Sequence, residues 1–492
     1  MSTTDDKSFE EKAPVDAVVK LPSNAHPVPI DPEVEKRVIR KLDCTVLLAF
    51  SLIFLLNYMD KIGLSYAAIF GMKPDLGLVG QDYSWCSSIF YFGQLVAEFP
   101  VLYFLHALPL RSFVAVSIVA WGIVVACQAA PQNFAGMMVV RFFLGITEGA
   151  VAPAFVVMIS FFYRKREQPI RIAAFVTANA IAQIVGALLL YGCGSIKNAA
   201  LAGWRLSFLV QFALTIVGGA VFFLLVPNSP ATAWFLKPEE REVAVQRVAE
   251  ERASGAHKEF EWHQVKQTLI DPKFYIVFLW AVFVCITSVV SFGSIVINGL
   301  GFSPFKTLLV GLPGPAIQMA TIWIGAACLK FFPNSRGWTQ MGLTLVPLVG
   351  VAMMKGLPYS QKWALTGGYW LATCNSSVYT INLACISSNV KGHTRKSLHS
   401  IAYFIGYCVG CISGPQLFLS HESPLYPTAM GTILGMYAAY LLSQLLYQEL
   451  CRRENRRRDR LAAEGVEEAK PRLAAHEDNQ SDIDDLAFRY VL

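Results

Sequence analysis

Charged residues are scarce in this chain of 492 residues, since Asp, Glu, Lys and Arg together make up only 15% of it. An average soluble domain carries about 25%, so the shortage argues against a water-soluble protein. Histidines are few and do not cluster, and the cysteines show no metal spacing with a nearby histidine. The loops also lack a nucleophile–base set and a phosphate-binding glycine loop. We therefore expect no metal, no cofactor and no enzymatic activity.

Long apolar runs are abundant instead, in a chain that is 54% hydrophobic. About twenty apolar residues cross the hydrocarbon core of a bilayer. Twelve runs approach or exceed that length: 43–64, 84–106, 110–130, 134–162, 172–195, 204–226, 274–298, 306–332, 338–356, 363–388, 398–420 and 426–450. The sequence predicts an all-α membrane protein whose twelve transmembrane helices form two bundles of six.

Lys and Arg flank one set of the membrane ends far more than the other, which places both termini in the cytoplasm. The basic run 452–460 is best explained as an anchor on anionic lipid, not as a nucleic-acid site. We expect a multi-pass protein of the plasma membrane, without a cleavable signal peptide, although a vacuolar membrane stays open. The expected parts are a cytoplasmic tail, a first bundle, a cytoplasmic loop, a second bundle and a cytoplasmic tail: 1–40, 41–226, 227–273, 274–450 and 451–492.

The two ends of the chain are polar, and residues 1–35 and 461–492 are expected to be disordered. An acidic stretch at 477–485 lies within the second of these tails. It indicates either a solvated tail or a site for trafficking or phosphorylation.

Four charged residues inside the predicted spans are the main functional signal. Arg141 and Glu148 lie seven residues apart in an otherwise uncharged run, so on a helix they share a face and are separated by about 10 Å. Asp60 and Lys61 lie near the end of the first run. Because charges inside a membrane are costly and rarely lack a role, we expect a polar pocket for an ionised solute. A structural lock between Arg141 and Glu148 is the alternative.

Further polar residues in the spans are weaker candidates for substrate contacts. Each could instead bond a neighbouring helix, an interaction worth about 0.6 kcal/mol on average. They recur at helical spacing: Asn179 and Gln183 in the fifth span, Asn375, Tyr379 and Asn382 in the tenth, and Tyr403 with Tyr407 in the eleventh.

The first half of the chain carries four short motifs: L-N-Y-M-D-K at 56–61, E-F-P at 98–100, R-F-F-L-G-I-T-E at 141–148 and G-W-R at 203–205. These motifs resemble the anion:cation symporter branch of the major facilitator superfamily. In the second half, 387–394, 406–410 and 414–416 resemble the fungal allantoate permease group.

This resemblance implies a proton-coupled importer of a small organic anion that works as a monomer. It assigns proton uptake to Asp60 and Glu148, with Lys61 and Arg141 holding the carboxylates or the substrate, and it turns Tyr58 toward the pocket. Allantoate, ureidosuccinate, nicotinate, pantothenate and related carboxylates all fit as substrates.

The chain also departs from the family pattern. Lys61 stands where the family has Arg, which removes the planar fork that grips a carboxylate at two points. Cys411 stands where relatives often carry Asn. An exporter of a fungal secondary metabolite is therefore an alternative function, and a non-transporting nutrient sensor is a more distant one.

Overall fold

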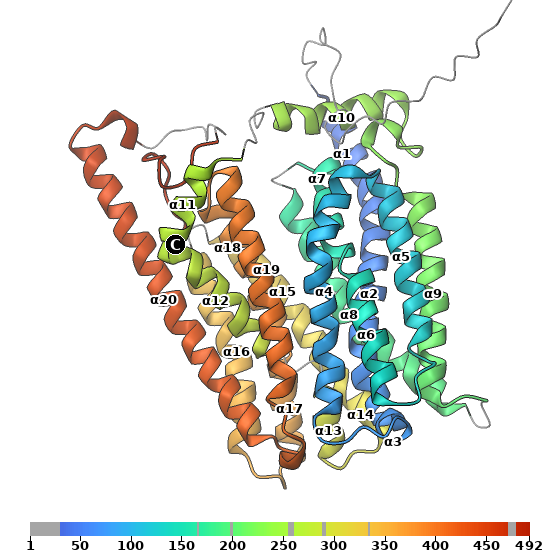
Figure 1. The fold of residues 1–492 in the computed structure, drawn as a ribbon. Coiled ribbons are helices and arrows are strands. Elements are labelled where there is room, and N and C mark those ends of the chain that lie inside the picture. Colours follow the sequence, from blue (N-terminus) through green and yellow to red (C-terminus); the bar gives the residue numbers. More distant parts are fainter. Residues whose placement is uncertain are drawn as a thin grey trace, which may run out of the picture.

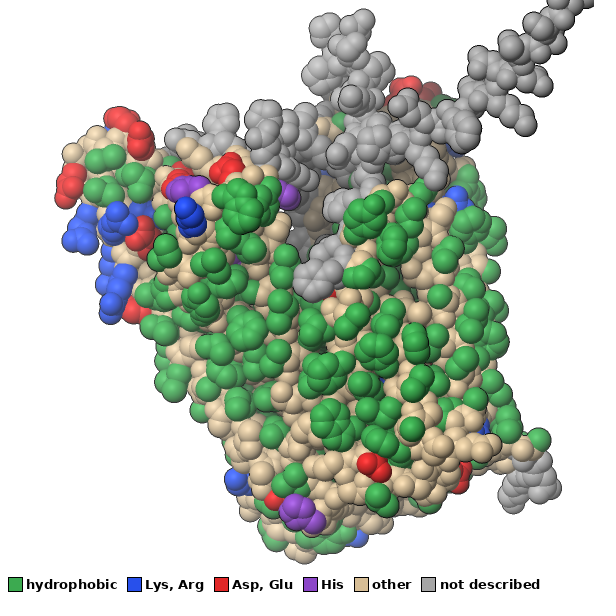
Figure 2. Space-filling view, in the orientation of Figure 1, with side chains coloured by type: hydrophobic (Ala, Val, Ile, Leu, Met, Phe, Trp, Pro, Cys, Tyr) green, Lys and Arg blue, Asp and Glu red, His purple; other side chains and the backbone are tan. Residues whose placement is uncertain are grey.

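The computed structural model describes residues 30–164, 167–196, 200–253, 260–287, 292–332, 335–470 and 479–492. Its long elements are α-helices, which form two bundles that lie side by side (Figure 1). Hydrophobic side chains cover the flank of both bundles in Figure 2, while most charged side chains gather near the ends. This distribution matches a protein whose flanks contact lipid.

The first bundle runs from α1 to α9. Its helices are α1 (Pro32–Leu42), α2 (Leu48–Ala67), α3 (Lys73–Asp75), α4 (Asp82–Ala107), α5 (Leu110–Cys127), α6 (Phe134–Glu148), α7 (Val151–Phe162), α8 (Gln168–Ser195) and α9 (Gly203–Leu225). A π-helical turn joins α1 to α2, so the first span continues from a polar helix without a break. Two further helices follow in the central loop, α10 (Pro238–Ala253) and α11 (Trp262–Ile270).

The second bundle runs from α12 to α20. Its helices are α12 (Pro272–Ile286), α13 (Gly293–Gly299), α14 (Pro304–Gly311), α15 (Pro313–Phe331), α16 (Arg336–Gly356), α17 (Lys362–Ala372), α18 (Asn375–Asn389), α19 (His393–Gln416) and α20 (Pro427–Ala463). Pro272, Pro304 and Pro313 stand in the first turns of their helices, where a missing N–H costs nothing.

Each predicted run coincides with one helix or with two consecutive helices. Within the described ranges, nine helices are long and apolar enough to cross a membrane, and a tenth is added if α11 and α12, bent by 71°, count as one span. Four runs are each divided between two helices: 134–162 into α6 and α7, 274–298 into α12 and α13, 306–332 into α14 and α15, and 363–388 into α17 and α18. Such interrupted helices are common in transporters, where they line the substrate pathway.

One end of the molecule, which we call the loop face, carries α1, α10 and α11 and lies at the top of Figure 1. Among the described residues, the ion pairs on this face do not cross from one bundle to the other. Helix α10 is attached to α1 of the first bundle, where Arg247 pairs with Glu35 at 2.9 Å and Glu240 with Lys41 at 2.6 Å. In the second, Arg395 pairs with Asp271 at 2.7 Å.

The predicted disorder of the tails is wrong where the structure describes them. Helix α1 begins at Pro32, α20 continues to Ala463, and residues 479–492 pack against the second bundle. Residues 1–29 and 471–478 lie outside the described ranges. The last residues are ordered because their polar groups find partners on distant helices, which a local count of polar residues does not register.

The two bundles contact each other toward the face opposite the loop face. Ser65 Oγ and Ser294 Oγ lie 2.6 Å apart, and Gln183 on α8 donates to Gln318 on α15 at 2.9 Å. A buried apolar cluster near Ser65 includes Trp204 from the first bundle and Phe418 from the second. The bundles are thus joined near one end and along their middle.

A close helix crossing fixes α6 against α4. A Cβ added at Gly145 would overlap the carbonyl oxygen of Phe90, and one at Gly93 would overlap that of Phe142. The crossing therefore requires glycine on both helices, because backbones approach this closely only where a side chain is absent. It also sets the position of Arg141, one turn before Gly145.

We expect Gly145→Ala to destabilise the protein by at least ~1–3 kcal/mol, since the methyl group must push two backbones apart. The measurement is the melting temperature and the monodisperse yield of protein purified in detergent. Gly342→Ala is the matched control, because the added Cβ would meet nothing within 4 Å and alanine favours a helix. Equal melting temperatures for the two variants would contradict the tight crossing.

Candidate functional site

Helices α2 and α6 bring the four predicted charges together inside the first bundle. Asp60 is completely buried, and Arg141 and Glu148 are each 3% exposed. The ammonium group of Lys61 lies 3.2 Å from Glu148 Oε1, which forms an ion pair between the two helices. Residues separated by more than eighty positions in the sequence thus form one charge cluster, which we call the α2–α6 cluster: Asp60, Lys61, Arg141 and Glu148.

Arg141 is not the partner of Glu148, and the lock between them that the spacing allowed is not formed. Arg141 Nε donates to the carbonyl oxygen of Cys86 at 3.3 Å, and Nη1 donates to Gln128 Oε1 at 3.2 Å. Among the described residues, no carboxylate forms an ion pair with Arg141. Two helical turns separate the residues along α6, whereas Lys61 reaches Glu148 from the neighbouring helix. The guanidinium group therefore keeps its capacity to bind an anion.

Asp60 completes the cluster, and both of its carboxyl oxygens are buried. The indole of Trp121 is its hydrogen-bonding neighbour, and its charged neighbours are Glu148, Arg141 and Lys61. Buried ionisable groups in a membrane protein usually mark an ion or proton path, so this carboxyl group is the second acidic member of the site.

The aromatic ring of Phe90 on α4 lies beside both cations. Lys61 Nζ is 5.7 Å and Arg141 Cζ is 5.4 Å from the centre of this ring. Aromatic faces attract cations at such distances, so Phe90 helps to hold two like charges near each other.

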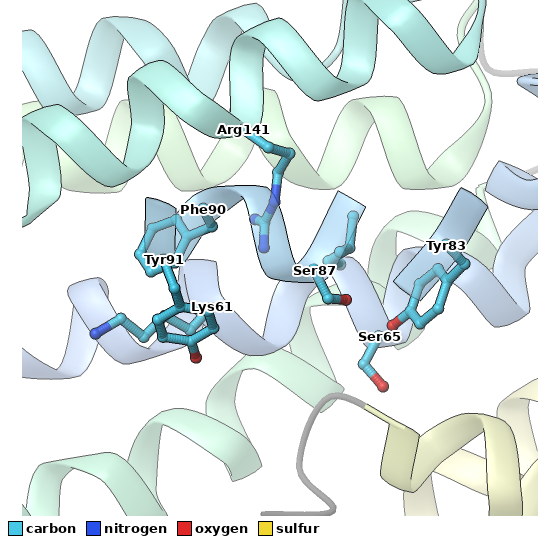
Figure 3. Close-up of a pocket in the computed structure, with 8 residues that line it drawn as sticks. Lys61, Ser65, Tyr83, Ser87, Phe90, Tyr91 and Arg141 are labelled. Carbon is cyan, nitrogen blue, oxygen red and sulfur yellow. The ribbon is translucent and has the colours of Figure 1, made fainter. Parts of the chain in front are cut away.

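A small pocket between α2, α4 and α6 is lined by Lys61, Phe90 and Arg141. Figure 3 shows Arg141 reaching from α6 toward Ser87 of α4, with Phe90 and Tyr91 on one side and Tyr83 on the other. Lys61, Leu64 and Ser65 of α2 complete the wall. Two cations, several hydroxyl groups and aromatic rings make this lining suitable for a small polar anion.

The weaker candidates for substrate contacts with amide side chains differ in their hydrogen-bond partners. Asn375 Nδ2 donates to the carbonyl oxygen of Val284 at 2.7 Å, and Asn382 Oδ1 accepts from Tyr440 at 2.8 Å, so both residues bond within the second bundle. Gln183 bonds across the bundles to Gln318. Asn179 lies one turn away, and its Oδ1 is buried without a hydrogen-bond partner among the described residues.

Tyr379 and Tyr403 belong to an aromatic cluster that joins the bundles near the pocket. Their ring centres are 5.5 Å apart, and Tyr379 lies 6.0 Å from Tyr407. Tyr407 in turn lies 5.9 Å from Tyr91, which lines the pocket from the first bundle. Tyr58 also faces this boundary, since Tyr369 and Cys411 of the second bundle are among its electrostatic neighbours.

Sequence reasoning missed the contribution of the second span. Tyr83, Ser87 and Tyr91 line the pocket from one face of α4, at positions i, i+4 and i+8. Hydroxyl groups at this helical spacing within an apolar run could have identified the three residues from the sequence. Gln128, the hydrogen-bond partner of Arg141, has no such signal because it lies at the end of α5.

A buried charge cluster in one of two helix bundles that cross the membrane defines a multi-pass membrane transporter. The sequence pattern of the Major Facilitator Superfamily matches residues 50–415. The chain belongs to this superfamily and, by its relatives, to the fungal allantoate permease-like group. It is therefore a small-molecule transporter, not an enzyme.

Known proteins support this assignment along most of the chain. An uncharacterized transporter of Schizosaccharomyces pombe is 35% identical over 94% of this chain and 91% of its own length. The allantoate permease of Saccharomyces cerevisiae is 30% identical over 97% of this chain and 90% of its own length. The proton:xylose symporter XylE superposes with a TM-score of 0.65 at 16% identity, covering 84% of this chain and 96% of that one. This likeness confirms the predicted fold of two six-helix bundles.

Proposed function

We propose that the protein imports a small organic anion together with protons. The observation that carries this proposal is the unequal state of the two cations: Lys61 is paired with Glu148, whereas Arg141 has no carboxylate partner among the described residues. Arg141 therefore anchors the substrate carboxylate. The allantoate permease relative supports an anionic substrate of this kind.

Proton uptake at Glu148 then makes Lys61 available. A protonated Glu148 no longer attracts the ammonium group, and Lys61 lies over the same aromatic ring as Arg141. A carboxylate bound to Arg141 would gain Lys61 as a second cationic partner. Anion binding and proton uptake thus favour each other.

Charge balance supports the same coupling. With all four members ionised, the α2–α6 cluster holds two positive and two negative charges. An entering monovalent anion adds one negative charge to a buried site, which is costly in a membrane. One proton on Glu148 or Asp60 removes that excess. The site therefore accommodates the anion and a proton together more easily than the anion alone.

We further propose that the loop face is cytoplasmic and that the protein works as a monomer in the plasma membrane, with bundles at 41–226 and 274–450. Basic residues of this face, such as Arg171, Lys273 and Arg395, lie at membrane ends of the helices, as the positive-inside rule requires. The run 452–460 extends the same charge along α20.

The test is uptake of a labelled panel of organic anions by yeast cells that lack their own permeases. We expect one compound to be taken up faster at an external pH of 5 than at 7, and a protonophore to remove the difference. If the protein is at the cell surface and no compound enters, import is contradicted and the export alternative is favoured.

A further inference from the structure

The last residues of the chain form a docked segment on the second bundle, which we call the clasp (479–492). Ser481 is 0% and Asp482 1% exposed, and Tyr490 is 3% exposed. Figure 1 marks the C-terminus beside α11 and α12. A terminal segment with so many polar residues becomes this buried only where the protein supplies matching partners.

Ion pairs hold the acidic part of the clasp. Asp482 accepts from Arg395 Nε at 2.9 Å and from the Tyr490 hydroxyl at 2.8 Å. Lys273 lies 3.7 Å from Asp482 Oδ2 and also 3.7 Å from the centre of the Tyr490 ring. Asp485 pairs with Lys391 at 2.5 Å. The clasp therefore neutralises cations that belong to α12, α19 and the loop before α19.

Backbone contacts attach the clasp to further helices. The side chain of Asn389 on α18 bonds both backbone groups of Val491, accepting from its N–H at 2.8 Å and donating to its carbonyl at 2.9 Å. Arg458 on α20 donates to the carbonyl oxygens of Asp482 at 2.6 Å and Phe488 at 2.8 Å. One short segment thus connects the loop-face ends of four helices of the second bundle.

The ion pairs of Asp482 do not weaken in the cytosolic pH range. Burial acts to raise the pKa of Asp482, but Arg395 and Lys273 outweigh it and hold the pKa below its ordinary value. A lowered pKa contributes stability above the unfolded value, and this contribution is lost only as the pH falls through the folded value. Asp482 therefore stays ionised at neutral pH, and its ion pairs persist until another signal weakens them.

Ser481 lies within the clasp and carries a hydroxyl group that a covalent modification could use. Its hydroxyl donates to Asp484 Oδ2 at 2.8 Å and accepts from the Asp484 N–H at 3.1 Å. The sequence Ser481-Asp-Ile-Asp-Asp places carboxylates one, three and four residues after the serine. Protein kinases that prefer acidic substrates act on serines with this arrangement, in a segment that is free to enter their active site.

We propose that Ser481 is a phosphorylation site and that its modification releases the clasp from the second bundle. The proposal rests on the cytoplasmic placement of the loop face given above. A serine kinase would transfer the γ-phosphoryl group of ATP: the bond from phosphorus to the ADP oxygen breaks, a bond to Ser481 Oγ forms, and the hydroxyl proton leaves. The docked state shields Ser481, so the kinase captures the clasp when it opens.

The phosphate prevents docking for two reasons. It adds nearly two negative charges beside Asp482, Asp484 and Asp485, and it removes the hydroxyl proton that bonds Asp484. The nearby cations do not compensate, because Lys391 is already paired with Asp485, and both Arg395 and Lys273 are paired with Asp482. The modified segment therefore stays in water.

The experiment uses the purified full chain, an acidophilic serine kinase and ATP, and needs no transport substrate. Mass spectrometry follows phosphate incorporation at Ser481, and amide hydrogen exchange follows protection of 479–492. Asn389→Ala opens the clasp without changing the kinase motif. Ser387→Ala, an exposed position on the same helix, is its matched control.

We expect the unphosphorylated clasp to be protected and the phosphorylated clasp to exchange like a free peptide. Asn389→Ala should be phosphorylated about tenfold faster than the wild type, because two buried hydrogen bonds are lost, and Ser387→Ala should match the wild type. Ser481→Ala should remain unmodified. The proposal is overturned if the open Asn389→Ala clasp is not phosphorylated, or if phosphorylation leaves its protection unchanged. Neither result bears on anion transport.

Discussion

Replacement of Glu148 by glutamine should abolish concentrative uptake while leaving exchange of substrate across the membrane. Glutamine has nearly the same size but cannot bind and release a proton, so the pH gradient no longer drives the cycle. One coupled proton provides about tenfold accumulation per pH unit, which the variant should lose completely. Lys61 loses its partner in this variant and remains free for the anion.

The measurement compares steady-state accumulation at pH 5 and pH 7 with counterflow exchange in vesicles at equal pH. Glu464→Gln, an exposed carboxylate just after α20, is the matched control and should accumulate substrate like the wild type. If Glu148→Gln still accumulates substrate more strongly at pH 5, Glu148 is not the coupling residue.

Arg141→Gln should remove substrate binding. Breaking a buried, hydrogen-bonded charge pair with the substrate costs about 2–5 kcal/mol, which is a loss of roughly 30-fold to several thousand-fold in affinity. Arg141→Lys keeps the charge but not the planar fork. We therefore expect its affinity for the substrate to lie between those of the wild type and Arg141→Gln, with a KM raised at least ~10-fold. Gln128 and the Cys86 carbonyl, which now hold the guanidinium group, cannot orient an ammonium group in the same way.

Two measurements separate binding from folding in these variants. The substrate-induced rise in melting temperature reports binding in detergent, and the elution profile reports the folded state. Arg111→Lys is the matched control, because Arg111 contacts Phe223 on the flank of the bundle, away from the pocket. An unchanged KM for Arg141→Lys would show that Arg141 does not grip the substrate.

Hydropathy predicted the spans well because the bilayer demands long apolar helices wherever the chain crosses it. The breaks inside α12–α13 and α17–α18 were not predicted, since an interrupted span has the same composition as a continuous one. The four charges were likewise visible as costly residues in apolar runs. Their pairing was not, because spacing along α6 says nothing about Lys61 on the neighbouring helix.

Partners from distant parts of the chain were not predicted. Asn375 and Asn382 lie along one helical face and bond α12 and α20 respectively, while their contact with the substrate stays a prediction. Asp482 resembles a solvated residue of a tail until Arg395 and Lys273 are placed beside it. In both cases the decisive information is tertiary, and it cannot be read from a local pattern.

The balanced α2–α6 cluster has an electrical consequence. With all four side chains ionised its charges sum to zero, so voltage exerts no net force on the cluster while the empty carrier changes conformation. A monovalent anion with one proton is also neutral. If Asp60 and Glu148 both carry protons, one net positive charge moves with the anion, and each 100 mV of membrane potential then supplies about 2.3 kcal/mol. The second buried carboxyl group, Asp60, thus determines whether voltage as well as acidity can drive the cycle.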